Sequence, residues 1–200
     1  MKIGIDLDGV VFDSETTFRT YEEIFDIDVL HGNNLVDKEE PKYQGRYNWT
    51  EDQEKQFIND YFLKVSKETT LMSGFSAVYP LLKSMGHELI VITARGGYVK
   101  KLAEDALKTL EKCNINFDKY YFAIKNKLEI CKKENIDLMI DDDYKIIDSV
   151  SNAKIKTLYF RDANMKKLPE NEYITEVNNW GDVYRYLKNI GNWLLPIFLY

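Results

Sequence analysis

The sequence predicts an α/β protein with a Rossmann-like, doubly wound parallel sheet and a helical insertion after the first strand. Two observations support this fold class. Short runs rich in Ile, Val, Leu, Tyr and Phe alternate along the chain with stretches of helical spacing, as buried parallel strands alternate with their crossover helices. After the first of these runs, residues 13–72 contain no convincing strand but many aromatic and charged side chains. That stretch interrupts the alternation and predicts a separate helical unit.

Six apolar runs are the expected strands: residues 2–7, 88–93, 119–124, 136–141, 156–160 and 173–177. Apolar residues at helical spacing predict helices over 76–85, 98–113, 127–134 and 180–190. Gly86 stands where the first of these helices should stop. Pro80 fits that helix best in its first turn, where a missing N–H group has little effect.

The insertion, residues 13–72, is expected to form a helical cap on a core made of residues 1–12 and 73–200. Phe18, Tyr21 and Phe25 fall at positions i, i+3 and i+7, which indicates one helical face. A second, more charged stretch repeats this spacing around residues 55–62, and a Gly-containing loop near residues 31–45 joins the two. The segment has neither repeats nor low complexity, so it is interpreted as a folded lobe rather than a linker.

Composition restricts the function. The chain has 200 residues, and 27 Lys and Arg against 33 Asp and Glu give a net charge of −6. An acidic surface repels phosphate backbones, so no nucleic-acid partner is expected. Two cysteines cannot form a disulfide framework, and the N-terminus lacks a signal-peptide pattern, so a cytoplasmic location is expected. The apolar tail after Gly191 is too short for a membrane span and is expected to pack on the core or on the second subunit of a homodimer.

Two aspartates stand at the end of the first expected strand, in the sequence Asp6-Leu7-Asp8-Gly9. Ligands of open α/β sheets bind beyond the carboxyl ends of the strands, and residues i and i+2 share a strand face. Calcium-binding loops also contain Asp-x-Asp-Gly, but that alignment puts Gly4 at the first ligand position and a strand where a helix is required. A catalytic pair and a turn-forming pair therefore remain the two interpretations.

Three further motifs stand at expected strand ends or helix starts. Thr93, in Ile92-Thr93-Ala94-Arg95, can hold a phosphate oxygen or simply cap a helix. Lys127, with Lys125 as the alternative, can neutralise a carboxylate and a bound anion. The run Asp141-Asp142-Asp143 concentrates negative charge after an apolar strand, which favours a metal site at Asp141 and Asp142, with Asp143 as a helix N-cap.

In this order the four motifs resemble those of the haloacid dehalogenase superfamily of aspartate-nucleophile phosphatases. The resemblance covers about residues 1–12 and 73–190, and the insertion stands where that superfamily places a helical cap. Within the superfamily the pattern looks like the 5′(3′)-deoxyribonucleotidase group and its bacterial relatives. The segments that suggest it are Ile92-Thr93-Ala94-Arg95, residues 127–142, and Val177-Asn178-Asn179-Trp180.

The resemblance implies a Mg²⁺-dependent phosphomonoesterase, a hydrolase that forms an aspartyl-phosphate. It implies Asp6 as the nucleophile and Asp8 as the general acid and base. Thr93 and Lys127 would balance phosphoryl charge, and phosphate-binding residues would be Thr93, Ala94, Arg95 and Lys127. Mg²⁺ would be held by Asp6, the Asp8 carbonyl and Asp142, with Asp141 behind them. Asp141 and Asp142 could exchange roles.

A (deoxy)nucleoside monophosphate is the expected small-molecule substrate. The cap aromatics that could stack on a nucleobase are Phe18, Tyr21, Tyr43, Tyr47 and Trp49, although the same rings could form the core of the cap. Arg46, Arg19 and Arg95 are candidate anion contacts. Alternative interpretations are a phosphosugar phosphatase or phosphomutase of the same superfamily, and a phosphoaspartate signalling domain. A signalling domain lacks both the insertion and the counterpart of Asp8.

Overall fold

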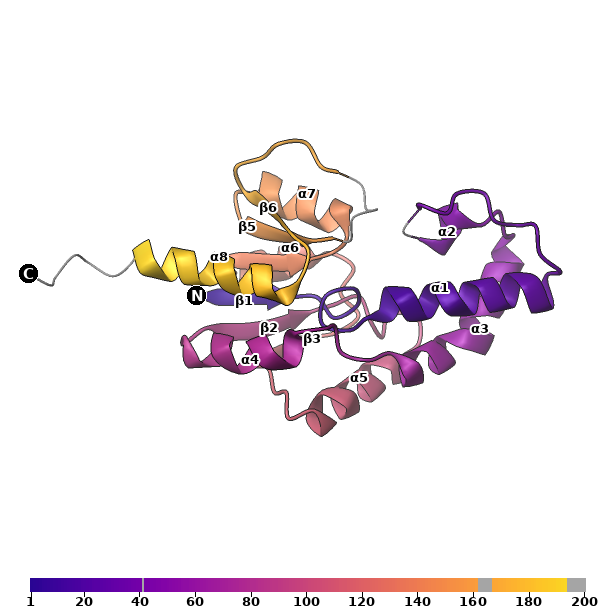
Figure 1. Cartoon of the computed structure of the whole chain (residues 1–200), viewed down its shortest axis with the longest axis horizontal. Helices are drawn as coiled ribbons and strands as arrows, with labels where there is room; N and C mark the ends of the chain where they lie inside the picture. The colour runs from indigo at the N-terminus through magenta and orange to yellow at the C-terminus, as the bar shows by residue number, and fades with distance from the viewer. Residues whose placement is uncertain (41, 162–166, 194–200) are drawn as a thin grey trace, which may run out of the picture.

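The computed structural model describes residues 1–40, 42–161 and 167–193. Its centre is one six-stranded sheet in the order β3-β2-β1-β4-β5-β6, with every neighbouring pair parallel (Figure 1). The strands are β1 (Lys2–Ile5), β2 (Glu88–Ile92), β3 (Lys119–Tyr121), β4 (Leu138–Asp141), β5 (Lys156–Phe160) and β6 (Ile174–Val177). All six predicted strands are present, and the predicted doubly wound parallel sheet is confirmed.

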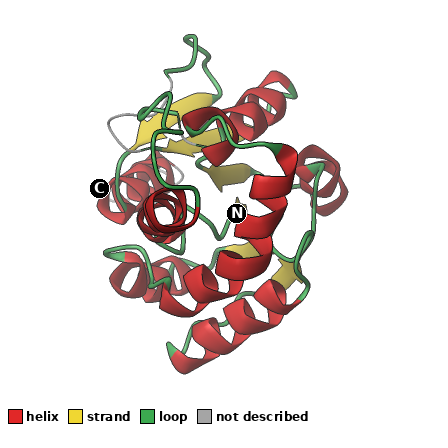
Figure 2. Cartoon of the chain, turned by 90° about the vertical axis from the view of Figure 1, so that its right-hand side faces the viewer, coloured by secondary structure: helices red, strands yellow, loops and turns green. Residues whose placement is uncertain are grey.

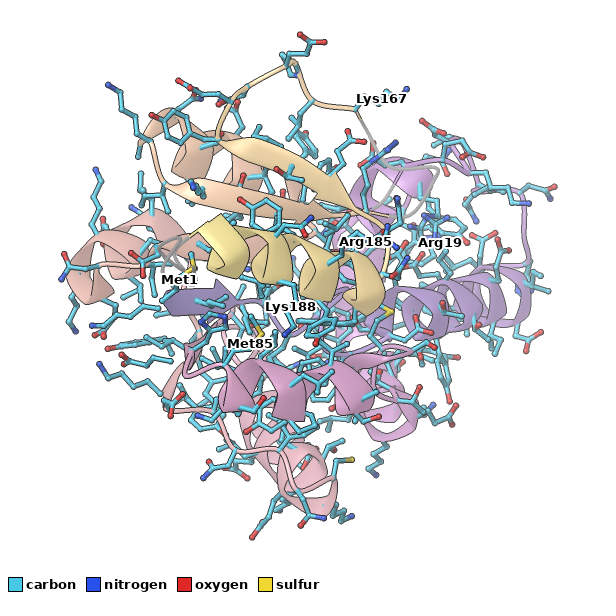
Figure 3. The ribbon with its side chains drawn as sticks, turned by 60° about the vertical axis from the view of Figure 1, so that its left-hand side comes forward. Met1, Arg19, Met85, Lys167, Arg185 and Lys188 are labelled. Atoms are coloured by element: carbon cyan, nitrogen blue, oxygen red, sulfur yellow. The ribbon has the colours of Figure 1, made fainter. Side chains whose placement is uncertain are left out.

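Helices cover both faces of this sheet. One face carries α4 (Phe75–Ser84), α5 (Lys101–Lys112) and α8 (Trp180–Trp193), and the other carries α6 (Lys127–Glu134) and α7 (Tyr144–Asn152). Successive strand residues point to opposite faces of the sheet. Leu89 and Val91 therefore pack on the side of α4, α5 and α8, while Ile90 and Ile92 pack on the side of α6 and α7. Helix α8 lies beside α4 over the sheet (Figure 3).

Two features of the helices differ from the prediction. No residue range was predicted for helix α7, although Asp143 was expected to cap a helix there, and Ile147 and Val150 supply its buried face. Pro80 lies in the second turn of α4 rather than in the first. Proline has no N–H group to donate to the carbonyl group of Ser76, four residues earlier. Both Pro80 and Ser76 are exposed, so that carbonyl group is on the solvent side of the helix.

The cap contains α1 (Ser14–Ile24), the π-helical turn η1 (Phe25–Val29), α2 (Tyr43–Arg46) and α3 (Glu51–Glu68), and Figure 2 views the molecule from this end. These elements pack around a core of their own, formed by Phe25, Tyr47, Trp49 and Phe57. Thr50 begins α3 with a reciprocal capping box to Gln53. The boundary between the cap and the core stays our interpretation.

The two chain segments that enter and leave the cap lie side by side. The Asp13 N–H group donates to the Thr70 carbonyl at 2.9 Å, and the Met72 N–H group donates to the Val11 carbonyl at 2.8 Å. Because β1 runs toward the cap, the cap covers the carboxyl ends of the strands (Figure 1). In the described part of the chain, no helix is long and apolar enough to cross a membrane. Residues 194–200, most of the apolar tail, lie outside the described residues, so its packing stays a prediction.

The Trp180 indole ties α8 to the loop after β1. It is fully buried, meets the Phe75 ring at 4.7 Å, and donates from Nε1 to the Val10 carbonyl at 2.8 Å. Trp180→Phe keeps an aromatic ring but leaves that carbonyl without its donor. We expect the free energy of unfolding to fall by about 1–3 kcal/mol, measured by urea denaturation. Tyr184→Phe on the same helix is the control, with an expected change within about 0.5 kcal/mol. Equal effects of the two variants would contradict this role.

Candidate active site

The loop after β1 places Asp6 at the bottom of a cavity. The Asp6 N–H group donates to the Ile140 carbonyl of β4 at 3.0 Å, which extends the sheet ladder by one residue. The Leu7 carbonyl then accepts from Val11 at 2.9 Å and Phe12 at 2.8 Å, so the chain turns back at once. Asp6 is 6% exposed. A carboxylate is thereby held at the carboxyl end of a central strand, where open α/β sheets bind ligands.

Gly9 allows the close approach of this loop to the loop after β4. Its φ is +72°, in the left-handed region. A Cβ atom at this position would lie 2.1 Å from Asp142 Oδ2. The Gly9 N–H group also donates to Ser14 Oγ at 3.1 Å, which joins the loop to the first residue of α1. Gly9 is therefore required both for its backbone conformation and for space.

Lys127 forms a buried ion pair with two carboxylates. Its Nζ atom lies 3.0 Å from Asp6 Oδ1 and 2.7 Å from Asp141 Oδ2, and the residue is 4% exposed. Burial opposes a charged ammonium, but Asp141 and Asp6 outweigh it and raise the pKa of Lys127. Lys125 is exposed, although it also lines the cavity. Of the two candidate lysines, the geometry brings Lys127 to the acidic residues.

Three acidic residues meet beside Lys127. Asp6, Asp141 and Asp142 each offer a carboxylate oxygen, and the three atoms lie within 4.8 Å of one another. Burial raises the pKa of Asp6 and of Asp142, and it raises the pKa of Asp141 to about 7. One ammonium group does not balance three carboxylates. The set consists of hard oxygen ligands and lacks positive charge, and both properties fit Mg²⁺.

Asp8 has a different partner from Asp6. Arg95 holds the Asp8 carboxylate in a fork, with Nε 3.1 Å from Oδ2 and a terminal nitrogen 2.6 Å from Oδ1. Burial raises the pKa of Asp8, but Arg95 outweighs this effect and lowers it. Another Arg95 nitrogen donates to Ser66 Oγ of α3 at 3.2 Å. The Arg95 guanidinium group, which was expected to bind phosphate, instead binds Asp8 and Ser66 of the cap.

Thr93 and Ala94 lie where the motif predicts, immediately after β2. Thr93 is 1% exposed, and its Oγ1 accepts from the Arg95 N–H group at 3.2 Å. That bond leaves the hydroxyl proton free to donate, and the Thr93 hydroxyl helps to lower the pKa of the neighbouring Asp6. Both residues line the cavity above Asp6.

The cavity lies between the core and the cap and has a volume of about 440 Å³. Pockets of about 300–1,000 Å³ hold small organic ligands. Core residues on its wall include Asp6, Asp8, Thr93, Ala94, Lys127 and Asp142, and cap residues include Glu15, Phe18, Glu22, Lys42, Tyr43 and Phe62. The residues predicted from four separate motifs therefore meet at one cavity, with two exceptions: Arg95 lines a smaller neighbouring cavity, and Asp141 is fully buried behind the wall, where it pairs with Lys127.

The candidate stacking aromatics divide into two groups. Phe18 and Tyr43 line the cavity. Tyr47 and Trp49 are buried in the cap core, where their rings stack at 4.5 Å, and Tyr21 packs on Tyr61 at 5.7 Å. Phe62, which was not singled out, completes the apolar wall and meets Phe18 at 5.1 Å.

A buried ion pair of the cap was missed by the sequence analysis. Arg46, 2% exposed, donates to Glu22 and also lies 2.8 Å from Glu15. Arg46 was considered only as an anion contact, and Glu22 was not considered. The available signal was the spacing of Glu15, Phe18 and Glu22, which puts all three on one face of α1.

One ion pair joins the cap to the acidic loop of the core. Lys42 Nζ lies 2.8 Å from Asp143 Oδ2, and both residues line the cavity. The other Asp143 oxygen accepts from the Lys145 N–H group at 2.9 Å, which confirms Asp143 as the N-cap of α7. The cap and the core are therefore connected across the cavity by opposite charges.

Comparison with solved structures shows which fold this is. A haloacid dehalogenase-like hydrolase from Streptococcus pneumoniae matches with a TM-score of 0.67 and 15% identity, over 93% of this chain and 97% of that chain. A haloacid dehalogenase-like hydrolase from Xanthomonas campestris matches with a TM-score of 0.65 and 11% identity, over 96% of both chains. A putative β-phosphoglucomutase from Thermotoga maritima matches with a TM-score of 0.60 and 17% identity, over 94% of this chain and 99% of that chain.

No protein-family model matches the sequence, and no curated protein matches it. The identities to the solved structures are low, and the likeness concerns the fold. The chain has the fold of the haloacid dehalogenase-like hydrolases, as its four motifs led us to expect.

Gly9 and Gly86 make a matched pair of test positions. Both have positive φ, +72° and +74°, but a Cβ atom on Gly86 meets nothing within 4 Å. We expect Gly86→Ala to lower the free energy of unfolding by about 1 kcal/mol, through the backbone alone. Gly9→Ala should lower it further, because its methyl group must displace Asp142. Urea denaturation measures both, and equal losses would show that the contact with Asp142 is unimportant.

Proposed function

We propose that the protein is a Mg²⁺-dependent phosphomonoesterase that uses Asp6 as its nucleophile and acts on a (deoxy)nucleoside monophosphate. The observation that carries the proposal is the position of Asp6: it is buried at the end of β1, pairs with Lys127, and faces a cavity that Asp8 and Thr93 also line. This arrangement brings a nucleophile, a proton donor and phosphate ligands to one place. The fold supports the same class of reaction.

In the first step an Asp6 oxygen attacks phosphorus, and the ester bond between phosphorus and the leaving oxygen breaks. Asp8, in its protonated form, gives its proton to that oxygen, so the leaving group departs as an alcohol. The Arg95 fork favours ionised Asp8, so proton transfer requires Asp8 to loosen from Arg95. The product of this step is an aspartyl-phosphate on Asp6.

In the second step water attacks the same phosphorus, and Asp8, now a carboxylate, takes the proton of the water. The bond between phosphorus and Asp6 breaks, which regenerates the carboxylate and releases inorganic phosphate. Lys127 and the Thr93 hydroxyl stabilise the oxygens of the transferring phosphoryl group in both steps. Each group therefore returns to its starting protonation state.

Asp6, Asp142 and the Asp8 carbonyl would hold the cation, and Asp141 would orient this set while it pairs with Lys127. When bound, Mg²⁺ supplies the positive charge that lets an anionic nucleophile approach an anionic phosphate.

The leaving group would extend toward Phe18, Phe62 and Tyr43, whose rings suit a nucleobase. A phosphosugar phosphatase or phosphomutase would use the same core, and two similar structures are described as β-phosphoglucomutases.

The test is phosphate release from deoxynucleoside and ribonucleoside monophosphates, sugar phosphates and an aryl phosphate, with Mg²⁺ or with a chelator. We expect turnover of nucleotides that the chelator abolishes. Asp6→Asn should reduce it by at least a thousandfold, because no covalent intermediate can form. Preference for a sugar phosphate would overturn the substrate assignment. Accumulation of aspartyl-phosphate without release of inorganic phosphate would indicate a phosphoaspartate signalling domain instead of a phosphatase.

Mg²⁺ should also stabilise the folded protein, more strongly at pH 8 than at pH 5. The raised pKa values of Asp6, Asp141 and Asp142 mean that protonation of these groups favours the folded state, so without the cation stability falls as pH rises above the ordinary range of a carboxyl group. For Asp141 this fall extends to about pH 7. At pH 8 the carboxyl group of Asp141 is above its pKa, so it is more ionised, and better able to bind the cation, than at pH 5. At a concentration of 100 times Kd, Mg²⁺ should add about 2.7 kcal/mol.

Thermal unfolding at matched ionic strength measures this stabilisation. Asp142→Asn should remove most of the Mg²⁺ effect, because it removes one of the three ligands. A larger Mg²⁺ effect at pH 5 than at pH 8 would contradict binding by these carboxylates.

A further inference from the structure

We propose that Glu22 selects the substrate, by accepting a hydrogen bond from an exocyclic amino group of a nucleobase in the leaving group. The inference rests on the proposed function, because it concerns the substrate of the same cavity. Its basis is the position of Glu22 on the cavity wall, its contacts, and the chemistry of its neighbours.

Helix α1 contacts the loop after β1, called the catalytic loop here, at one end and contains Glu22 near the other. At its first residue, Ser14 Oγ accepts from the Gly9 N–H group at 3.1 Å, and Glu15, Phe18 and Glu22 follow on the cavity wall. Eight residues separate Ser14 from Glu22, which corresponds to roughly 12 Å along the helix. Glu22 is therefore at the far end of the cavity from the reacting phosphate, where the distal part of a leaving group would lie.

One oxygen of Glu22 is free to bind a ligand. Arg46 donates to Glu22 Oε2, and no described residue donates to Oε1. Glu22 is only 2% exposed, so water has little access to this carboxylate. Glu22 lines the cavity, and a carboxylate oxygen there that accepts from no protein donor favours a ligand that supplies one.

Arg46 fixes the direction of the Glu22 carboxylate. Besides Glu22, it contacts Glu15 Oε1 at 2.8 Å and donates from Nε to the Glu40 carbonyl at 2.9 Å. Its side chain is 2% exposed. An arginine held by three partners gives Glu22 one orientation, which a specific contact with a ligand requires.

The local charge favours a neutral donor over a cationic one. Arg19 contacts Glu15 at 2.5 Å, so two arginines, Arg19 and Arg46, accompany two glutamates, Glu15 and Glu22. The cluster is balanced without a ligand, and an ammonium group would bring an uncompensated charge into it. An amino group on an aromatic ring donates hydrogen bonds without carrying a charge.

The remaining walls fit a flat ring. Phe18 and Phe62 meet edge to face at 5.1 Å, and Tyr43 lies on the same cavity. Burial raises the pKa of Glu22 to about 7, so Glu22 is mainly ionised at pH 8 and can only accept hydrogen bonds there. Assays at pH 8 therefore test the acceptor form.

The test compares nucleotides that differ by one amino group: guanosine with inosine 5′-monophosphate, and adenosine with purine riboside 5′-monophosphate. At pH 8 we expect kcat/KM to be about tenfold or more higher for the amino-bearing member of at least one pair. Glu22→Gln should reduce that ratio to near one, because the amide group can turn a donor toward the ligand. Glu39→Gln, the same charge change at an exposed cap position, should keep the ratio.

Ratios within twofold for both pairs in the unmodified protein would overturn the inference without affecting the phosphatase, since nucleotides would still be hydrolysed. A ratio that Glu22→Gln leaves unchanged would overturn it as well. Preference for phosphoethanolamine over every nucleotide would overturn the inference, because it would show that the cavity binds an ammonium group rather than an amino group on a ring. If no ester is hydrolysed, the proposed function fails, and calorimetry with the free nucleosides still tests Glu22: equal affinities within each pair overturn the inference.

Discussion

The buried ammonium group of Lys127 is the contact on which the rest of the site depends. Asp6 follows β1, Asp141 ends β4, and Lys127 begins α6, so one side chain connects three elements at the carboxyl edge of the sheet. Two carboxylates this close repel each other strongly in a medium of low dielectric constant. Lys127 makes their proximity possible, and its single charge still leaves the group of three acidic residues short of positive charge.

The shortage of positive charge results from the close packing of the two loops. Gly9 has no side chain, so the loop after β1 comes close enough to Asp142 to bring all three carboxylates together. A larger residue at position 9 would move Asp142 away and reduce the repulsion, but it would also separate the three carboxylate oxygens that could hold a cation. The structure therefore keeps an unfavourable arrangement that a bound cation, or protonation of a carboxylate, relieves, as is typical of functional sites.

The sheet could be predicted from the sequence because buried parallel strands are continuous apolar runs, such as residues 88–92. The four motifs were recognisable because each follows a strand or begins a helix. Helix α7 was expected only through its N-cap, Asp143, and its extent was not predicted, because the interpretation of the acidic run concentrated on the strand end. The Arg95–Asp8 pair joins residues 87 positions apart, and the Glu22–Arg46 pair joins residues 24 apart. No local periodicity encodes such contacts, so they required the structure.

The cap does more than cover the cavity, because its contacts reach the groups that we propose carry out the chemistry. Arg95 touches both Asp8 and Ser66 of α3, so a movement of α3 alters the partner of the proposed general acid. Ser14 joins the catalytic loop to α1, whose other end carries Glu22. A leaving group bound at Glu22 would therefore fix the same helix that positions Gly9. Substrate recognition in the cap and proton transfer in the core then depend on shared contacts, which couples the choice of substrate to its hydrolysis.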